Sequence, residues 1–369
     1  MITPIALGGA ASAAALAAAV TRFHLLGEDL SKYDGADADK RFPSDPNSEG
    51  AQKVRAFLDE HFIKPAAAPG SREEKLRDKR RMFDENGLNR EFDCAFRDAT
   101  IQTEDGELTG EWTIPDDCTP EKRLLYIHGG ANTVGSAVSH RPIITNLANR
   151  TRCAVFAPNY RLMPENARLD GVKDCRAAYE WVCENGPDGP APAGALSIGG
   201  DSAGANLTLS LINWVRDEGK RTPQAVFAIS PAVDTTFASP SLKGNLDTDL
   251  MLKPLATPLL KVPRPLMLWL SWRVNGVSPS DPAISPIFAD LSGLPPTLIH
   301  ISSAEILFDD ARRYAAKRAA CGSPARLHVW EHMAHVWHIF DRFLPESHQA
   351  FDDIADFMRE NGAAAGPAQ

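Results

Sequence analysis

Apolar and polar residues follow different patterns before and after about residue 90. In the first part, apolar residues recur at helical spacing over residues 51–62, and a strongly charged helix is predicted over residues 72–84. The Pro- and Ala-rich residues 64–70 break the pattern between these two helices. We therefore expect residues 1–90 to form a helical cap segment that is added to the main domain and lies outside its sheet.

From about residue 91, short apolar runs alternate with helical stretches. Runs at 92–102 and 107–114 flank a turn and predict two paired strands. Further strand candidates are residues 124–127, 154–157, 195–199, 225–229, 297–301 and 327–330. Helical stretches such as 169–184 and 203–218 separate most of them. This alternation is typical of an α/β fold with a mostly parallel sheet and helices on both faces.

One stretch, at about residues 236–280, interrupts the alternation. It contains an apolar helix candidate over residues 259–274. The large side chains of this candidate are Leu266, Leu268, Trp269, Leu270 and Trp272. They predict either an apolar wall for a substrate or simply the interior of a cap. We expect residues 91–365 to form one α/β domain that carries this stretch as a cap insertion.

The segment Gly200-Asp201-Ser202-Ala203-Gly204 joins a predicted buried strand to a predicted helix. In this context a G-x-S-x-G sequence places its serine on a sharp, strained turn, which requires small neighbours. The start of the helix directs N–H groups, including that of Ala203, toward a developing oxyanion. The pattern predicts Ser202 as a nucleophile, and the structural alternative is a glycine-rich turn with a serine N-cap.

A second glycine pair, in His128-Gly129-Gly130-Ala131, follows the strand predicted at 124–127. Glycines allow the backbone to approach a substrate closely, and a loop of this kind donates N–H groups to an oxyanion. We expect the N–H groups of Gly130 and Ala131, with that of Ala203, to form an oxyanion hole, and Gly129 to shape the loop. His128 is expected to anchor the loop by hydrogen bonding.

These motifs together resemble the hormone-sensitive-lipase-like family of α/β hydrolases. The matching segments are His128-Gly129-Gly130-Ala131, Gly135-Ser136, Ser139-His140-Arg141, residues 159–165, residues 200–206, residues 281–286 and Met333-Ala334-His335. Their order and spacing agree over roughly residues 95 to 360. The resemblance implies an α/β-hydrolase fold with an eight-stranded, mostly parallel sheet and a helical cap built from the N-terminal segment and the insertion. The family usually has a third glycine where this chain has Ala131.

The resemblance also assigns the base and the acid. The histidine candidates near the C-terminus are His328, His332, His335, His338 and His348. Alignment with the family pattern selects His335, and the chain order serine, acid, histidine is that of the fold. The family's acid, usually aspartate, falls on Glu305 in this sequence. A glutamate can also orient the imidazole, and Asp309 is the alternative acid.

This arrangement implies a serine carboxylesterase that works through an acyl-enzyme, and the family resemblance implies short to medium acyl esters as its substrates. It requires no metal and no organic cofactor. The same catalytic residues would also serve an amide or N-acetyl deacylase, or a lactone hydrolase. A non-catalytic receptor for a small molecule is the alternative from another class, but such a relative of this family has lost the catalytic histidine.

Charge and cysteine content limit the partners and the cellular location that we expect. The formal net charge of -9 over 369 residues gives no electrostatic basis for binding nucleic acid. The six cysteines form no CxxC pair, which favours free thiols and a cytoplasmic location. Residues 2–20 are uncharged and rich in Ala and Gly. They leave open a helix packed on the protein, a weak membrane anchor or a signal for export. A homodimer is also left open.

Overall fold

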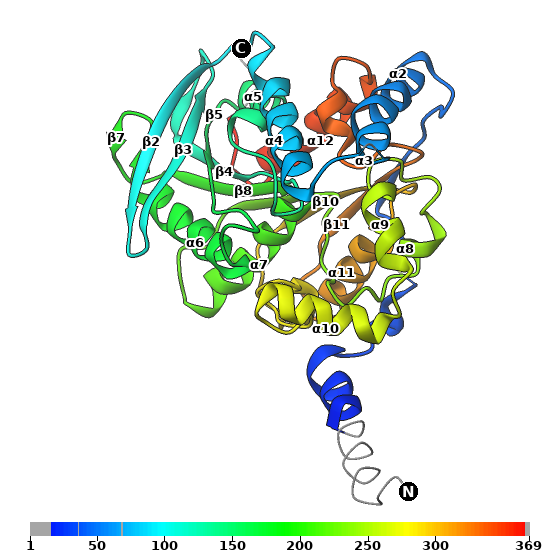
Figure 1. The fold of residues 1–369 in the computed structure, drawn as a ribbon. Helices are drawn as coiled ribbons and strands as arrows, with labels where there is room; N and C mark the ends of the chain where they lie inside the picture. Colours follow the sequence, from blue (N-terminus) through cyan, green and yellow to red (C-terminus); the bar gives the residue numbers. More distant parts are fainter. Residues whose placement is uncertain (1–15, 36, 68, 366–369) are drawn as a thin grey trace, which may run out of the picture.

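The computed structural model describes residues 16–35, 37–67 and 69–365, and its centre is a nine-stranded sheet (Figure 1). The strand order is β1-β11-β10-β9-β8-β4-β5-β3-β2. The strands are β1 (Lys40–Phe42), β2 (Ala95–Thr103), β3 (Gly106–Ile114), β4 (Thr119–Ile127), β5 (Cys153–Pro158), β8 (Ala195–Asp201), β9 (Ala225–Ile229), β10 (Thr297–Ser302) and β11 (Arg326–Trp330). Only β3 pairs antiparallel, with β2 and β5. The α/β-hydrolase fold is therefore confirmed.

The expectation of eight strands was wrong by one. The additional strand, β1, lies in the N-terminal segment that we expected to stay outside the sheet, and it pairs parallel with β11. Phe42 stacks on Trp330 with ring centroids 3.9 Å apart, and its carbonyl accepts a hydrogen bond from the Glu331 N–H. A strand of three residues is too short to show the alternation that predicts strands.

Helices cover both faces of the sheet, and each face has its own apolar core. On one face lie α5 (Arg141–Thr151) and α12 (Pro345–Glu360). On the other lie α6 (Arg168–Glu184), α7 (Ala203–Asp217) and α11 (Phe308–Ala320). The central strands β5, β8 and β9 are buried along their whole length, as expected for parallel strands between two helical layers.

The cap contains helices from both predicted segments (Figure 1). The N-terminal segment supplies α2 (Glu49–Leu58), the π-helical turn η3 (Asp59–Ile63), the short α3 (Lys64–Ala67) and α4 (Arg72–Leu88). The insertion supplies α8 (Ser241–Gly244), α9 (Lys253–Leu260) and α10 (Arg264–Asn275). We predicted one helix over residues 259–274, but the chain forms two, because Pro263 precedes α10 and cannot continue a helix from α9. The domain boundaries at residues 90 and 91 stay a prediction.

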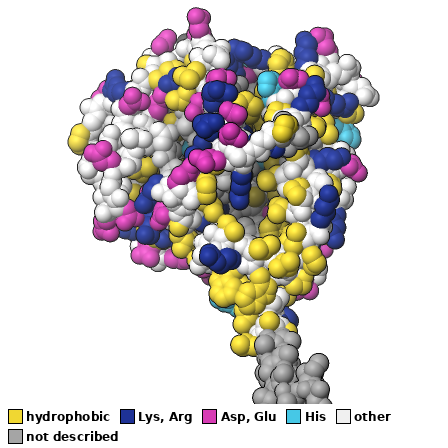
Figure 2. All heavy atoms as spheres, in the orientation of Figure 1, with side chains coloured by type: hydrophobic (Ala, Val, Ile, Leu, Met, Phe, Trp, Pro, Cys, Tyr) yellow, Lys and Arg dark blue, Asp and Glu magenta, His cyan; other side chains and the backbone are white. Residues whose placement is uncertain are grey.

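The first described residues pack against α10. The π-helical turn η1 (Thr21–Leu25) receives a hydrogen bond of 2.9 Å from Trp269 Nε1 to Thr21 Oγ1. Figure 2 shows apolar side chains gathered over this part of the surface, where Phe23, Leu266 and Leu270 are exposed. Within the described residues, no helix is long and apolar enough to cross a membrane. Most of the segment 2–20, on which the predictions of an anchor or export signal rest, lies outside the described residues.

Candidate active site

Ser202 lies between the end of β8 and the start of α7, on the sharp turn that the sequence predicts. Its backbone φ is 52° and its ψ is -116°, a conformation that a residue with a side chain rarely adopts. The turn also needs a small residue at Gly204, because a Cβ there would lie 2.0 Å from the Ile127 carbonyl oxygen. The strained turn leaves the Ser202 hydroxyl at the wall of a cavity.

Ser202, His335 and Glu305 form a continuous chain of hydrogen bonds. His335 Nε2 lies 2.9 Å from Ser202 Oγ, and His335 Nδ1 lies 2.5 Å from Glu305 Oε2. The second carboxylate oxygen of Glu305 accepts hydrogen bonds from the Ser302 N–H at 2.8 Å and the Ser230 hydroxyl at 2.9 Å. Glu305 follows β10 and His335 follows β11, so the parallel strands carry both side chains to the edge where Ser202 ends β8.

Asp309, the alternative acid, binds other groups than His335. Its carboxylate accepts a hydrogen bond of 2.8 Å from the Ser241 N–H and forms an ion pair with Arg312 at 3.0 Å. It shows no contact with a histidine among the described residues. Of the two carboxylates that the sequence left open, the geometry thus places only Glu305 beside His335.

The loop after β4 bends through three consecutive residues with positive φ, Gly130 at 112°, Ala131 at 53° and Asn132 at 58°. Gly130 and Ala131 are the two that the sequence predicts as oxyanion donors. In the described part of the chain, neither residue's N–H donates a hydrogen bond to a protein acceptor. The Gly129 N–H, in contrast, donates to Asp201 Oδ1 at 3.0 Å. Gly129 therefore fits the expected role of shaping the loop, whereas Gly130 and Ala131 keep their donors free.

The side chain of His128 holds this loop in place. Its Nδ1 lies 2.8 Å from the Gly129 carbonyl oxygen, and its ring stacks on Tyr160 at 4.3 Å. Burial lowers the pKa of His128 to about 3, so the ring is neutral at physiological pH. Tyr160 donates a hydrogen bond of 2.8 Å to the His128 carbonyl. The side chain thus has the anchoring position that the sequence predicts and does not contact the Ser202 hydroxyl.

Comparison with known proteins places this geometry in a family. A family model described as "alpha/beta hydrolase fold" matches residues 124–339. The chain belongs to this family. An esterase structure from the bacterial hormone-sensitive lipase family shows 29% identity with a TM-score of 0.72 and covers 85% of this chain and 99% of its own. The chain is thus an α/β hydrolase of the hormone-sensitive-lipase-like type.

Similar proteins with known names are called esterases or acetyl-hydrolases. An acetyl-hydrolase of Streptomyces hygroscopicus is 34% identical over 69% of this hydrolase and 80% of its own length. An esterase of Acinetobacter venetianus is 32% identical over 63% of this chain and 73% of its own. A solved esterase/lipase from an uncultured bacterium is 32% identical, with a TM-score of 0.72, and covers 86% of this chain and 100% of its own.

Burial and their mutual hydrogen bond both shift the pKa values of Glu305 and His335. Both side chains are almost fully buried, at 0% exposure for Glu305 and 3% for His335. Burial raises the pKa of Glu305, although the hydrogen bond and charge of His335 act in the opposite direction. Burial alone would lower the pKa of His335, but the hydrogen bond and charge of Glu305, together with the charges of Asp249 and Asp201, outweigh it and the pKa is raised. The carboxylate therefore favours the imidazolium form that arises when His335 takes a proton.

Another buried acidic group near His335, Asp249, had no signal in the sequence. Its buried carboxylate accepts N–H groups of Leu252 and Ile306, each at 3.0 Å, and its charge also raises the pKa of His335. Burial raises the pKa of Asp249 itself. Asp249 lies in the insertion, far from Glu305 in the sequence, so only the folded cap brings the two carboxylates near the same imidazole.

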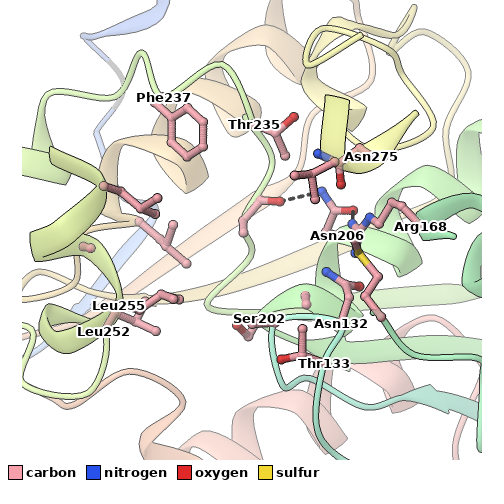
Figure 3. Close-up of a pocket in the computed structure, with 18 of the residues that line it drawn as sticks. Asn132, Thr133, Arg168, Ser202, Asn206, Thr235, Phe237, Leu252, Leu255 and Asn275 are labelled. Carbon is pink, nitrogen blue, oxygen red and sulfur yellow. Dashed lines mark hydrogen bonds between the residues drawn. The ribbon is translucent and has the colours of Figure 1, made fainter. Parts of the chain in front are cut away.

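Ser202 lines a cavity of about 940 Å³ and also a smaller one of about 110 Å³, which His335 lines as well. Figure 3 shows Ser202 between two halves of the larger cavity, with Phe237, Leu252 and Leu255 on one side and polar side chains on the other. Of the apolar side chains predicted from residues 259–274, none of Leu266, Leu268, Trp269, Leu270 and Trp272 lines this cavity. Apolar side chains of the same stretch do line it, namely Leu259, Leu260, Met267 and Val274. The segment thus contributes to the apolar wall, but not through the five named side chains: Leu266 and Leu270 are exposed, and Leu268 is buried in the cap.

One group of side chains elsewhere has the composition of a metal site. His300 and His328 both lie within hydrogen-bond distance of Asp353 Oδ2, at 2.9 and 2.6 Å. Such short distances match direct hydrogen bonds. Burial lowers the pKa of His300 to about 4, and the two rings hold the pKa of Asp353 low against the effect of burial. This cluster connects β10, β11 and α12 and has no contact with Ser202.

Proposed function

We propose that this hydrolase cleaves carboxylic esters through an acyl-enzyme formed on Ser202. The observation that supports the proposal is the continuous hydrogen-bond chain from Ser202 through His335 to Glu305 at the cavity wall. The relatives named acetyl-hydrolase and esterase point to the same reaction class. The protein is accordingly a carboxylesterase-type serine hydrolase that acts on a small-molecule ester.

In the first half of the reaction, His335 accepts the proton of the Ser202 hydroxyl while Ser202 Oγ attacks the ester carbonyl. The carbonyl oxygen becomes an oxyanion, and the free N–H groups of Gly130, Ala131 and Ala203 are the donors that stabilise it. Collapse of the tetrahedral intermediate breaks the bond to the alcohol oxygen. His335 gives its proton to that oxygen, and the alcohol leaves.

In the second half, His335 removes a proton from a water molecule, and the resulting hydroxide attacks the acyl-enzyme. The same oxyanion donors act again, and the carboxylic acid is released as Ser202 recovers its proton from His335. Glu305 stays ionised throughout, because its two oxygens accept hydrogen bonds from His335, Ser302 and Ser230. Its part is to hold the imidazole in the tautomer with Nδ1–H and to stabilise the cation.

We retain short to medium acyl esters as the proposed substrates. Amide, N-acetyl and lactone substrates use the same residues, and the names of the relatives favour esters over them. A receptor without catalysis is disfavoured by the presence of His335 within hydrogen-bond distance of Ser202. Parallel rates on an ester, its isosteric amide and a lactone of equal size would rank the three reactions.

The direct test is Ser202→Ala, assayed with p-nitrophenyl esters of increasing acyl length and with a fluorophosphonate probe. We expect loss of measurable turnover and of labelling, with the far-UV spectrum unchanged, because the variant lacks only the nucleophilic oxygen. Ser71→Ala is a matched control, since Ser71 caps the exposed start of α4. Turnover of Ser202→Ala close to that of the wild type would refute the proposal.

Association with a membrane or with a second copy stays a prediction. The exposed apolar side chains Phe23, Leu266 and Leu270 give the surface at which to direct a test. Sedimentation of the protein with and without lipid vesicles would separate the two kinds of association.

A further inference from the structure

Arg168, the first residue of α6, is a buried arginine with no ionic partner in the part of the chain that the structure describes. Its side chain lines the large cavity, yet the residue is only 6% exposed. Nη2 donates one hydrogen bond, of 2.8 Å, to Asn206 Oδ1, and Nη1 has no acceptor among the described residues. Burial lowers the pKa of this guanidinium to about 10, so Arg168 is still a cation at neutral pH.

The carboxylates that line the same cavity are engaged elsewhere. Asp310 accepts the N–H groups of Val233 and Asp234, at 2.9 and 3.1 Å. Asp234 Oδ1 accepts both the N–H and the hydroxyl of Thr236. Glu165 is paired with an arginine of α4. No carboxylate of the described residues lies within ion-pair distance of Arg168, although the cavity wall contains three.

A buried charge that lacks a partner is costly, and proteins normally pair it or place it where a ligand supplies the opposite charge. The guanidinium group presents planar, paired donors that match a carboxylate. Asn206 satisfies one donor but contributes no charge. The N–H groups of Nη1, in contrast, have no acceptor among the described residues, and the carboxylate of a ligand would supply one.

Asn206 fixes the distance between this cation and the nucleophile. Its backbone N–H donates to the Ser202 carbonyl at 3.1 Å, so Asn206 lies four residues beyond Ser202 on α7, a rise of about 6 Å. Figure 3 shows Arg168, Asn206 and Asn132 on the polar side of the cavity, opposite Leu252 and Leu255, with Ser202 between the two sides. In an ester bound at Ser202, the acyl part and the alcohol part would thus extend to opposite sides, one toward Arg168 and the other toward the apolar side chains.

We infer that Arg168 is a substrate-binding residue that pairs with a carboxylate on the ester, a few bonds from the scissile carbonyl. The inference rests on the proposed esterase function and narrows it to anionic esters, in which the carboxylate belongs to either the acyl or the alcohol part. Asn206 positions the guanidinium, and the polar side of the cavity accommodates the charged arm.

The test compares kcat/KM for anionic esters and their neutral counterparts. For the acyl part, the pair is p-nitrophenyl hydrogen adipate and its methyl ester. For the alcohol part, it is 4-(butanoyloxy)butanoate and the corresponding primary amide. We expect the wild type to prefer the anionic member of at least one pair. Arg168→Gln should reduce that preference about tenfold to a hundredfold, the range for loss of a charge-assisted hydrogen bond. Arg168→Lys should retain part of it.

Arg72→Gln is the control for general attraction, because Arg72 also lines the cavity but is exposed. Its anionic-to-neutral ratio should stay close to that of the wild type. Inhibition of wild-type neutral-ester hydrolysis by adipate, compared with adipamide, tests the inference even if the Arg168 variants do not fold. The inference fails if both pairs give wild-type ratios near one, if adipate inhibits no better than adipamide, or if Arg72→Gln and Arg168→Gln change the ratio equally. Hydrolysis of the neutral esters would persist in each of these outcomes, whereas its absence would refute the esterase function itself.

Discussion

The substitution Glu305→Gln tests the orientation of the catalytic imidazole. In the native site one carboxylate oxygen accepts two donors, the Ser302 N–H and the Ser230 hydroxyl, and the other accepts the proton on His335 Nδ1. A glutamine carbonyl satisfies the two donors best, which turns its NH₂ group toward His335. The imidazole then becomes the acceptor at Nδ1 and carries its proton on Nε2, where it can no longer take the proton of Ser202.

The expected loss follows from this tautomer change. A triad that keeps its geometry but has the wrong tautomer loses about 10⁴-fold in kcat, or about 5 kcal/mol of transition-state stabilisation. Because glutamine has nearly the shape of glutamate, the fold should persist. We expect Glu305→Asp, which keeps the charge but is one methylene shorter, to lose much less activity than Glu305→Gln.

The assay is steady-state hydrolysis of p-nitrophenyl butyrate, with Tm measured for each variant. Asp309→Asn is the matched control, since Asp309 is the alternative acid and contacts Ser241 and Arg312 but no catalytic side chain. It should keep kcat within a few-fold of the wild type. The reasoning is refuted if Glu305→Gln keeps turnover within tenfold of the wild type, or if Asp309→Asn loses as much as Glu305→Gln does.

Two further predictions concern the pH profile and the oxyanion loop. Because Glu305 raises the pKa of His335 above its ordinary value of 6.5, kcat/KM should fall as pH decreases through a midpoint above 6.5, where the base becomes protonated. A midpoint at or below that value would contradict the charge balance. Gly129→Ala should lose most turnover and about 1–3 kcal/mol of stability, because its Cβ would lie 2.1 Å from Asp201 Oδ2. Gly244→Ala, with no atom within 4 Å of its Cβ, is the control in urea unfolding.

The local parts of the active site could be predicted from the sequence. The strand, turn and helix around Ser202 and the glycine pair before Ala131 are encoded by neighbouring residues, because small side chains and positive φ are requirements of the local backbone. His335 and Glu305 came from the family resemblance, and the structure places His335 between Ser202 and Glu305. Their spacing alone would not have separated Glu305 from Asp309.

Other features depended on the tertiary structure. The edge strand β1 is too short to have a pattern of its own and forms only because β11 offers a free edge. Asp249 reaches the catalytic imidazole through the fold of the cap, and Arg168 is distinguished by the absence of a partner among the described residues. Sequence patterns report interactions within a few residues, whereas these contacts join segments tens of residues apart. The sequence thus determined the fold class and the strand, turn and helix around Ser202, and only the packing of the cap and helices on the sheet decided which charges line the cavity.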